Sequence, residues 1–317
     1  MDFRNVLIAI VLSTLVLVGW GTFFEAPIVE EQTAEKEITK SKDLTSPSID
    51  EDAKEIKSEI IRSDTINKTK RVKIENENIK GSLSLEGAII DDIIFKNYKE
   101  TLNGENKVTF LNPKNSSKEY FIETGWASGG SEKINLPLLD TIWKAKGGST
   151  LTPNNPITLE WDNGDGLTFT KKIELDEKFL FIITQGIKNN SNKSFKFYPY
   201  AQITRNYRPT VTPIYILHEG FIGVFDEELK EEDYKDIEKE KFVANSRKGW
   251  LGITDKYWLT AIIPEKGKKF KSEFLSKDGK YKANFIIAEP TVLDSNATKT
   301  SEIKAFTAAK EVAIIDS

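Results

Sequence analysis

The sequence has no cysteine and only one histidine, His218, in 317 residues. The absence of thiols excludes disulfides, iron–sulfur clusters, thiolate nucleophiles and Cys/His zinc sites formed within one chain. A Ser-His-Asp triad could use only His218, and an acid–base role would need a carboxylate such as Glu219 or Asp226 within hydrogen-bond reach. The spacing does not establish such contact, so we expect His218 to be a strand-end residue that is hydrogen-bonded to its surroundings. We accordingly predict no catalytic, cofactor-binding or metal-binding residue and no enzymatic activity.

The chain also lacks an excess of positive charge, because 45 basic residues face 49 acidic ones and the net charge is −4. A surface that binds nucleic acid needs a basic patch to neutralise phosphates, so we expect no nucleic-acid partner. Hydrophobic residues make up 38% and charged residues 30% of the chain, which is typical of a soluble globular protein and not of a multi-span membrane protein.

One long hydrophobic run stands near the start. Residues 5–24 carry no charge and lie between Arg4 and Glu25. As a helix they would extend about 30 Å, the thickness of the bilayer core. The alternative is a cleaved signal peptide, but its apolar region is usually about 7–15 residues long, and this run lacks a good small-residue cleavage site. We predict that residues 1–24 are a retained transmembrane signal anchor that contacts the lipid bilayer through residues 5–24. The positive-inside rule then puts the N-terminus in the cytoplasm.

Composition changes twice after this run. Residues 25–70 contain no Phe, Trp, Tyr or Gly and are dense in charge, which predicts a disordered charged linker. From residue 71 onward, short apolar runs alternate with Gly, Asn, Asp and Pro, and residues 71–306 are predicted to form one folded domain. Residues 307–317 are predicted to begin a connecting helix, with Ala308–Ile315 as its helical stretch.

The apolar runs of the folded domain have a period of two or are short and fully apolar, which favours strands. The candidate strands are Ile79–Leu85, Ala88–Phe95, Val108–Leu111, Tyr120–Trp126, Ile157–Trp161, Leu167–Phe169, Ile173–Leu175, Phe179–Ile187, Phe195–Phe197, Tyr198–Thr204, Tyr215–Leu217, Phe221–Phe225, Trp250–Thr254, Trp258–Ile263, Phe270–Leu275, Tyr281–Ile287 and Thr300–Phe306. So many strands with short turns predict an all-β fold, a large antiparallel sandwich.

Three segments invite a functional interpretation and have a simpler structural one. Asp162-Asn163-Gly164-Asp165-Gly166 resembles a calcium loop, but the ligand spacing fails, and these residues suit a hairpin turn. Tyr198-Pro199-Tyr200 predicts an edge strand or a bulge, with the tyrosines used for packing. The mixed charges of Asp226–Lys241 favour a solvated loop or a short exposed helix.

Several strings, taken in their order along the chain, carry a family resemblance. They are Met1–Asn5, Gly81–Asp92, Lys96–Thr101, Tyr120-Phe121, Gly125-Trp126, Leu151–Pro153, Trp161–Gly164, Tyr198–Ala201, Ile216–Gly220, Gly249–Trp258, Ala308–Val312 and Ile314–Asp316. Together they resemble the signal anchor and first periplasmic domain of the YidC/Oxa/Alb family of membrane protein insertases, in its alphaproteobacterial form. The linker is not part of the resemblance.

The resemblance implies a β-supersandwich related to galactose mutarotase, located on the periplasmic side of the bacterial inner (cytoplasmic) membrane. In the family this domain precedes a bundle of transmembrane helices that inserts and folds nascent inner-membrane proteins, alone or with the Sec translocon and its accessory Sec membrane subunits. The sequence stops at Ser317, before the positions of those helices. We therefore expect an N-terminal part of such an insertase, on which none of the family's groove residues can be placed.

Two other functions stay open at this point. The first is a non-catalytic periplasmic β-sandwich that binds carbohydrate or peptide. Sugar conversion itself is disfavoured, because a mutarotase-type site uses a pair of histidines and this chain has one. The second is a plain structural protein of the cell envelope.

Overall fold

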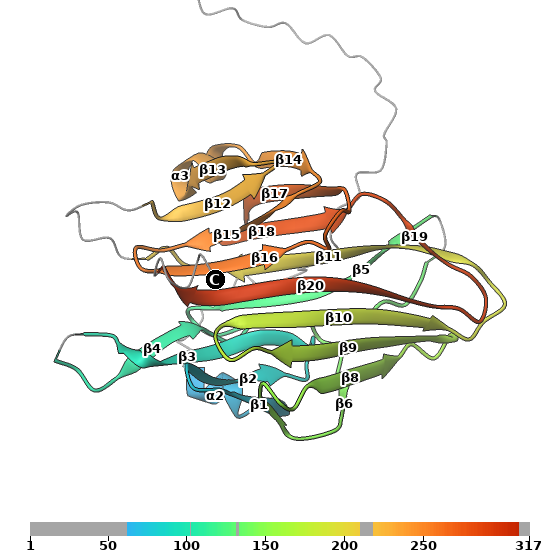
Figure 1. Ribbon diagram of the computed structural model, residues 1–317, viewed down its shortest axis with the longest axis horizontal. Coiled ribbons are helices and arrows are strands. Elements are labelled where there is room, and N and C mark those ends of the chain that lie inside the picture. Colours follow the sequence, from blue (N-terminus) through green and yellow to red (C-terminus); the bar gives the residue numbers. More distant parts are fainter. Residues whose placement is uncertain (1–61, 102, 131–132, 210–217, 311–317) are drawn as a thin grey trace, which may run out of the picture. The chain divides into compact units, whose positions relative to one another are not determined.

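Two large β-sheets make up most of the described chain (Figure 1). The computed structural model describes residues 62–310, except 102, 131–132 and 210–217. All of these belong to one compact unit, Leu44–Ser317. The predicted membrane segment, residues 5–24, and most of the predicted linker lie outside the described residues. Among the described residues no helix has the length and apolar character needed to cross a membrane.

The first sheet has eleven strands. In spatial order they are β14 (Phe242–Ser246), β17 (Phe270–Lys277), β18 (Lys280–Ile287), β11 (Phe195–Arg205), β5 (Tyr120–Gly129), β3 (Ile89–Lys99), β2 (Ile79–Ser84), β1 (Arg71–Glu75) and β7 (Thr150–Leu151), with β19 (Thr291–Leu293) beside β11 and β4 (Lys107–Leu111) beside β3. The pairs in this sheet are antiparallel, apart from the short parallel contact of β1 with β7.

The second sheet has nine strands, all in antiparallel pairs. Their order is β13 (Glu228–Asp233), β12 (Gly220–Phe225), β15 (Gly249–Thr254), β16 (Trp258–Ile263), β20 (Thr298–Ala309), β10 (Leu180–Asn189), β9 (Leu167–Leu175), β8 (Ile157–Asp162) and β6 (Lys144–Lys146). Two short helices accompany the sheets, α2 (Arg62–Ile66) and α3 (Tyr234–Lys239).

The two sheets pack face to face, and alternate residues of their strands form one continuous hydrophobic core. Rings from opposite sheets stack: Trp258 of β16 lies 5.0 Å from Phe95 of β3, and Phe221 of β12 lies 5.1 Å from Phe274 of β17. The nine-stranded sheet is in front in Figure 1. The prediction of a large antiparallel β-supersandwich is confirmed.

The end of the domain differs from the prediction. Ala308 and Ala309, expected to start a helix, continue strand β20, and they pair with Leu259 and Trp258 of β16. Ala308 is fully buried. Tertiary pairing thus overrides the helical propensity of alanine, because the small side chains fit closely beneath the facing sheet. Residues 311–317, the rest of the predicted helix, lie outside the described residues.

Two charged segments are more ordered than expected. Arg62–Ile66, within the predicted disordered linker, form α2. Asp226–Lys241 were predicted to be a solvated loop or exposed helix, but they contain strand β13, paired with β12, and then α3. Tyr234 and Ile237 of α3 are buried, so the helix covers part of the core with one apolar side.

Pro199 lies inside the eleven-stranded sheet, so the prediction of an edge strand is wrong, and no register shift marks a bulge there. The sheet accommodates the proline because β11 changes neighbours at this point. On the side of β11 that faces away from β5, Phe197 pairs with β19 and Tyr200 pairs with β18. The two residues between them have no partner strand on that side. A missing backbone N–H therefore breaks no ladder there. Tyr198 and Tyr200 pack with Ala127 and Ile286, as predicted.

Candidate functional site

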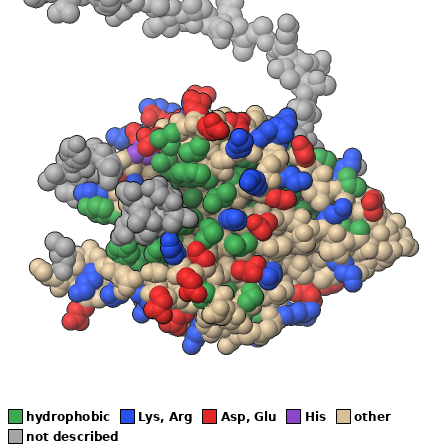
Figure 2. Space-filling model, viewed as in Figure 1, with side chains coloured by type: hydrophobic (Ala, Val, Ile, Leu, Met, Phe, Trp, Pro, Cys, Tyr) green, Lys and Arg blue, Asp and Glu red, His purple; other side chains and the backbone are tan. Residues whose placement is uncertain are grey.

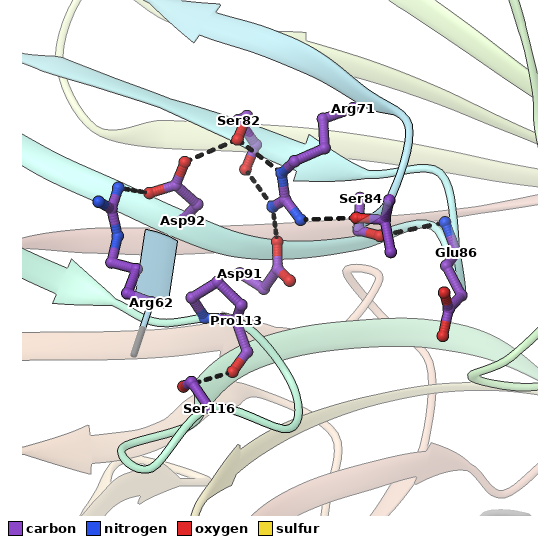
Figure 3. A network of polar contacts seen from close by, with 10 residues as sticks. Arg62, Arg71, Ser82, Ser84, Glu86, Asp91, Asp92, Pro113 and Ser116 are labelled. Carbon is purple, nitrogen blue, oxygen red and sulfur yellow. Dashed lines mark hydrogen bonds and ion pairs between the residues drawn. The ribbon is translucent and has the colours of Figure 1, made fainter. Parts of the chain in front are cut away.

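Two adjacent aspartates on β3 form the centre of a polar network. Ser82 of β2 pairs with Asp92, while Leu83 pairs with Ile90, so Asp91 is the extra residue of a β-bulge. Such a bulge re-aims side chains locally. Here it brings the carboxylates of Asp91 and Asp92 into one connected set of contacts (Figure 3).

Two arginines complete this network. Arg62 of α2 forms an ion pair with Asp92, and Arg71 of β1 forms one with Asp91. Ser82 links the two pairs, since its Oγ donates to Asp92 Oδ2 at 2.6 Å and accepts from Arg71 Nε at 2.7 Å. The side chains of Arg71 and Asp91 are only 8% and 3% exposed. The network is therefore a buried, charge-compensated cluster that connects α2 to the sheet.

A cavity of about 190 Å³ adjoins the network, lined by Lys68, Arg71, Lys114, Glu86 and Asp91 among others. Burial raises the pKa of Asp91 to about 6, although the neighbouring Arg71 opposes this shift. The carboxyl group can thus change its charge under mildly acidic conditions. The described lining brings the cations Lys68, Arg71 and Lys114 together with the carboxyl groups of Glu86 and Asp91, which suits an ionic contact.

A second buried cation lies between the sheets. Lys171 of β9 is 3% exposed, and its Nζ donates to Thr124 O at 2.7 Å and to Ala88 O at 3.3 Å. Gln185 of β10, its cross-strand neighbour, donates to Gly125 O at 2.9 Å. Trp143 lies under the Lys171 ammonium, 5.1 Å from it. Burial lowers the pKa of Lys171 to about 8. These contacts fasten the two sheets together.

A third buried charge is Arg205, at the end of β11. Its guanidinium donates to Asp255 Oδ1 at 2.6 Å and lies 4.0 Å and 4.7 Å from the ring centres of Tyr207 and Tyr120. Arg205 is 2% exposed. A guanidinium that contacts two aromatic rings and pairs with a carboxylate is a stable arrangement for a buried cation.

The residues singled out in the sequence do not converge on a site. His218 Nε2 lies 2.8 Å from Phe221 O, so the prediction of a histidine hydrogen-bonded to its surroundings is confirmed. Its proposed strand, Tyr215–Leu217, lies outside the described residues. The carboxylate beside the ring is Asp233, 3.7 Å from Nδ1, and not Glu219 or Asp226. Asp226 instead accepts the backbone N–H groups of Arg247 and Lys248.

The apparent calcium loop is a hairpin turn, as predicted, between β8 and β9. Asp162 Oδ1 accepts from Gly164 N at 2.9 Å, and this bond lowers the pKa of Asp162. Asn163 Oδ1 accepts from the backbone N–H groups of Asp165 and Leu167. The carboxylate and amide oxygens are thus used within the turn. Among residues 62–310, so far as they are described, no group of three acidic or histidine side chains could hold a metal ion.

The sequence predicted none of these three buried charge clusters, although each interrupts an apolar pattern. Lys171 stands where Leu167, Phe169, Ile173 and Leu175 predict an inward residue. Asp91 and Asp92 interrupt an otherwise apolar strand. A charged residue at an inward position is the signal that would have pointed to them.

The sandwich resembles solved structures of the mutarotase type. A galactose mutarotase related enzyme from Lactobacillus acidophilus matches with a TM-score of 0.53 and 9% identity, over 77% of this chain and 99% of that one. A protein from Synechocystis sp. PCC 6803 matches with a TM-score of 0.50 and 8% identity, over 81% of this chain and 99% of that one. At such identities the likeness concerns the fold alone.

Sequence comparison is more specific. Membrane protein insertase YidC of Pelagibacter ubique is 41% identical over all of this chain and 56% of its own length. The proteins of the same name from Bradyrhizobium diazoefficiens and Rickettsia canadensis are 32% and 36% identical, each over 99% of this chain. The chain spans a little over half the length of these relatives. The family model described as YidC periplasmic domain matches residues 71–317, which include every strand of the two sheets, and the chain therefore belongs to the YidC periplasmic domain family.

Proposed function

We propose that this chain is the N-terminal part of a membrane protein insertase, in which the sandwich serves interaction and spacing and performs no chemistry. Residues 1–24 anchor it in the inner membrane with the N-terminus in the cytoplasm. Residues 25–61 are the linker, α2 is its docked end, and the sandwich stands in the periplasm. Its partners are the Sec translocon with accessory Sec subunits, and nascent inner-membrane proteins reach the insertase through a further domain.

The observation that carries this proposal is the family match over residues 71–317. It coincides with the strand-rich body that begins at β1, Arg71–Glu75, and reaches β20, Thr298–Ala309. Relatives named as insertases extend well beyond the length of this chain. The uncharged run at residues 5–24 supplies a span-length segment of about 30 Å on the other side of the linker.

The buried charges support a structural role. Arg71 pairs with Asp91, Lys171 donates to backbone carbonyls, and Arg205 pairs with Asp255, so each of these cations contacts groups of the chain itself. A general base needs an available lone pair within reach of a substrate proton. The lone histidine is turned toward the backbone oxygen of Phe221. The proposal of a non-enzymatic module therefore agrees with the geometry of the described charges.

The experiment is a topology measurement on the full chain in bacterial cells. Since the chain has no cysteine, single variants Asn97→Cys on β3 and Asp2→Cys before the predicted anchor provide two matched reporters. A membrane-impermeant maleimide applied to spheroplasts should label Asn97→Cys at least about tenfold more than Asp2→Cys, because the bilayer core excludes a charged reagent. The chain should also stay in the membrane after carbonate washing.

Labelling of Asp2→Cys and not of Asn97→Cys would contradict the proposed orientation. Release by carbonate would contradict the anchor. Lysis of the spheroplasts before labelling is the control, since both positions should then react equally.

A further inference from the structure

An apolar strip runs across the outward face of the nine-stranded sheet, on four neighbouring strands. Leu229 of β13 pairs with Val224 of β12, and Val224 pairs with Trp250 of β15. Ile263 follows on β16 and pairs with Lys304 of β20. We call Leu229, Val224, Trp250 and Ile263 the apolar strip.

The strip faces away from the core. Its neighbours in sequence, Leu251 and Ile262, belong to the core, and successive side chains of a strand point to opposite faces. Leu229 is 54% exposed, and Val224, Trp250 and Ile263 are partly exposed. Figure 2 shows hydrophobic side chains gathered over β12, β15 and β16, with side chains of both charges around them. An exposed apolar patch with a polar rim is typical of an interaction surface.

Cations border the strip at one end. Arg247 and Lys248 precede β15, Lys266 follows β16, and these three with Lys304 line a cavity of about 330 Å³. Ile263 lines the same cavity, so the cavity and the strip are continuous. Two carboxylates, Glu265 and Glu302, are also in the lining, which leaves an excess of positive charge.

Most of these cations lack a counter-ion. Lys248 forms a long, exposed pair with Glu227 at 3.7 Å. Within the described part of the chain, Arg247, Lys266 and Lys304 have no carboxylate at ion-pair distance. Glu265, the nearest candidate in sequence, instead accepts a hydrogen bond from Ser301 at 3.0 Å. The unpaired positive charge favours binding of an anionic partner. Because the apolar strip adjoins these cations, the partner should also have an apolar part.

We propose that the apolar strip and its cationic cavity dock the sandwich onto an anionic phospholipid surface. The cavity takes phosphate-bearing headgroups, and Trp250, Val224 and Leu229 enter the interface between headgroups and acyl chains. The inference rests on the proposed function, which holds the sandwich beside a membrane.

The chemistry of the strip favours a lipid surface over a protein partner. Tryptophan beside aliphatic residues and basic side chains is the composition that membrane interfaces select, because the indole suits the boundary between water and lipid. Each Lys or Arg near an anionic membrane surface adds to the electrostatic attraction. The strip crosses several strands of one sheet face, so its side chains can meet a plane together.

The test uses the full chain in proteoliposomes. A bimane fluorophore is attached to Val224→Cys on the strip or to Asn97→Cys on β3 of the other sheet, and nitroxide-labelled lipid is the quencher. In vesicles containing phosphatidylglycerol, quenching at Val224→Cys should exceed that at Asn97→Cys by at least about twofold, and high salt should abolish the difference because it screens the attraction. Vesicles of phosphatidylcholine alone should show no difference.

A variant carrying Arg247→Glu, Lys266→Glu and Lys304→Glu should lose the quenching at Val224→Cys and keep the fold, as judged by its circular dichroism. Equal quenching at the two positions in anionic vesicles would overturn the proposal. Strong quenching at Val224→Cys that is the same in anionic and in phosphatidylcholine vesicles would also overturn it. Flotation of the chain with the vesicles reports the anchor separately. If the chain does not float with the vesicles, the proposed membrane anchor is contradicted. The quenching measurement, made with vesicles added to the chain from outside, would still test whether the apolar strip binds anionic lipid.

Discussion

At the scale of single residues, Lys171 connects the two sheets with a buried cation, and its ionisation should be visible in the pH dependence of stability. Burial lowers its pKa to about 8 in the folded chain, whereas in the unfolded chain its pKa keeps the ordinary lysine value of 10.5. Between these values the unfolded state binds more protons, so the contribution of Lys171 to the free energy of unfolding rises with pH. Across the window the rise is on the order of 2–3 kcal/mol.

The measurement is denaturant unfolding of the native chain and of Lys171→Met at pH 7.5 and at pH 10. The native chain should gain stability relative to the variant at the higher pH. Because tyrosines and other lysines titrate in both proteins, their effects cancel in the difference. Parallel pH profiles for the two proteins would show that Lys171 keeps an ordinary pKa.

Arg205 offers a contrast between a buried and an exposed ion pair. Arg205→Ala removes a 2%-exposed cation and leaves Asp255 without its partner, so we expect a loss of about 3–5 kcal/mol in the free energy of unfolding. Lys239→Ala is the matched control, because Lys239 and Asp236 form an exposed pair at 2.9 Å whose loss costs about 0.5 kcal/mol or less. Equal losses of unfolding free energy in the two variants, measured by denaturant unfolding, would show that burial does not make the Arg205 pair more important than the exposed pair.

These residues also mark the limit of sequence-based prediction. Turn chemistry at Asp162 and Asn163 was predictable, because it depends on side chains bonding to backbone a few residues away. The partners of Lys171 and Arg205, Thr124 and Asp255, lie 47 and 50 residues away in sequence. A local pattern contains no information on which backbone carbonyl or carboxylate faces such a residue, so the charged clusters could not be assembled from sequence.

At the scale of elements, we expect the ion pair of Arg62 with Asp92 to stabilise α2. A helix of five residues is not stable by itself, so Arg62–Ile66 must be held by the contact of Arg62 with Asp92. Arg62→Ala should therefore speed amide exchange in α2 by at least about tenfold, the equivalent of roughly 1.4 kcal/mol, and leave β2 and β3 protected. Lys68→Ala, which changes an exposed residue just after α2, is the control. Unchanged protection of α2 in Arg62→Ala would contradict this account.

The strand predictions succeeded where an apolar run had a clear period and failed where pairing alone makes the strand. β12 was predicted, and so was β10, from a fully apolar run. β9 was predicted as two alternating segments, Leu167–Phe169 and Ile173–Leu175, which the structure joins into one strand. β6, Lys144–Lys146, and β13, Glu228–Asp233, are charged edge strands that exist because β8 and β12 offer them free backbone groups. β1 was missed because it is short and carries charges at alternate positions.

At the scale of the whole molecule, we predict that the chain alone inserts no substrate into a membrane. Insertion needs a partly hydrated surface lined by several helices, since lipid tolerates no unpaired backbone. The sequence has one span-length apolar run, residues 5–24. Vesicles that carry the chain should therefore protect a small coat-type substrate from protease no better than empty vesicles do. Vesicles with a full-length relative are the positive control, and protection by the chain alone would refute the prediction.

The central claim is that the sandwich is the periplasmic interaction module of an insertase, and proximity in living cells tests it most directly. A photo-cross-linking amino acid is placed at one exposed position of each sheet, Val243 on β14 of the eleven-stranded sheet and Leu229 on β13 of the nine-stranded sheet, in the membrane-anchored chain. Cross-links to Sec translocon subunits, identified by mass spectrometry and absent when the same residue is placed in a chain without residues 1–24, are the predicted result. Cross-links from these positions only to soluble carbohydrate-binding or cell-wall proteins, with none to Sec subunits, would contradict the account.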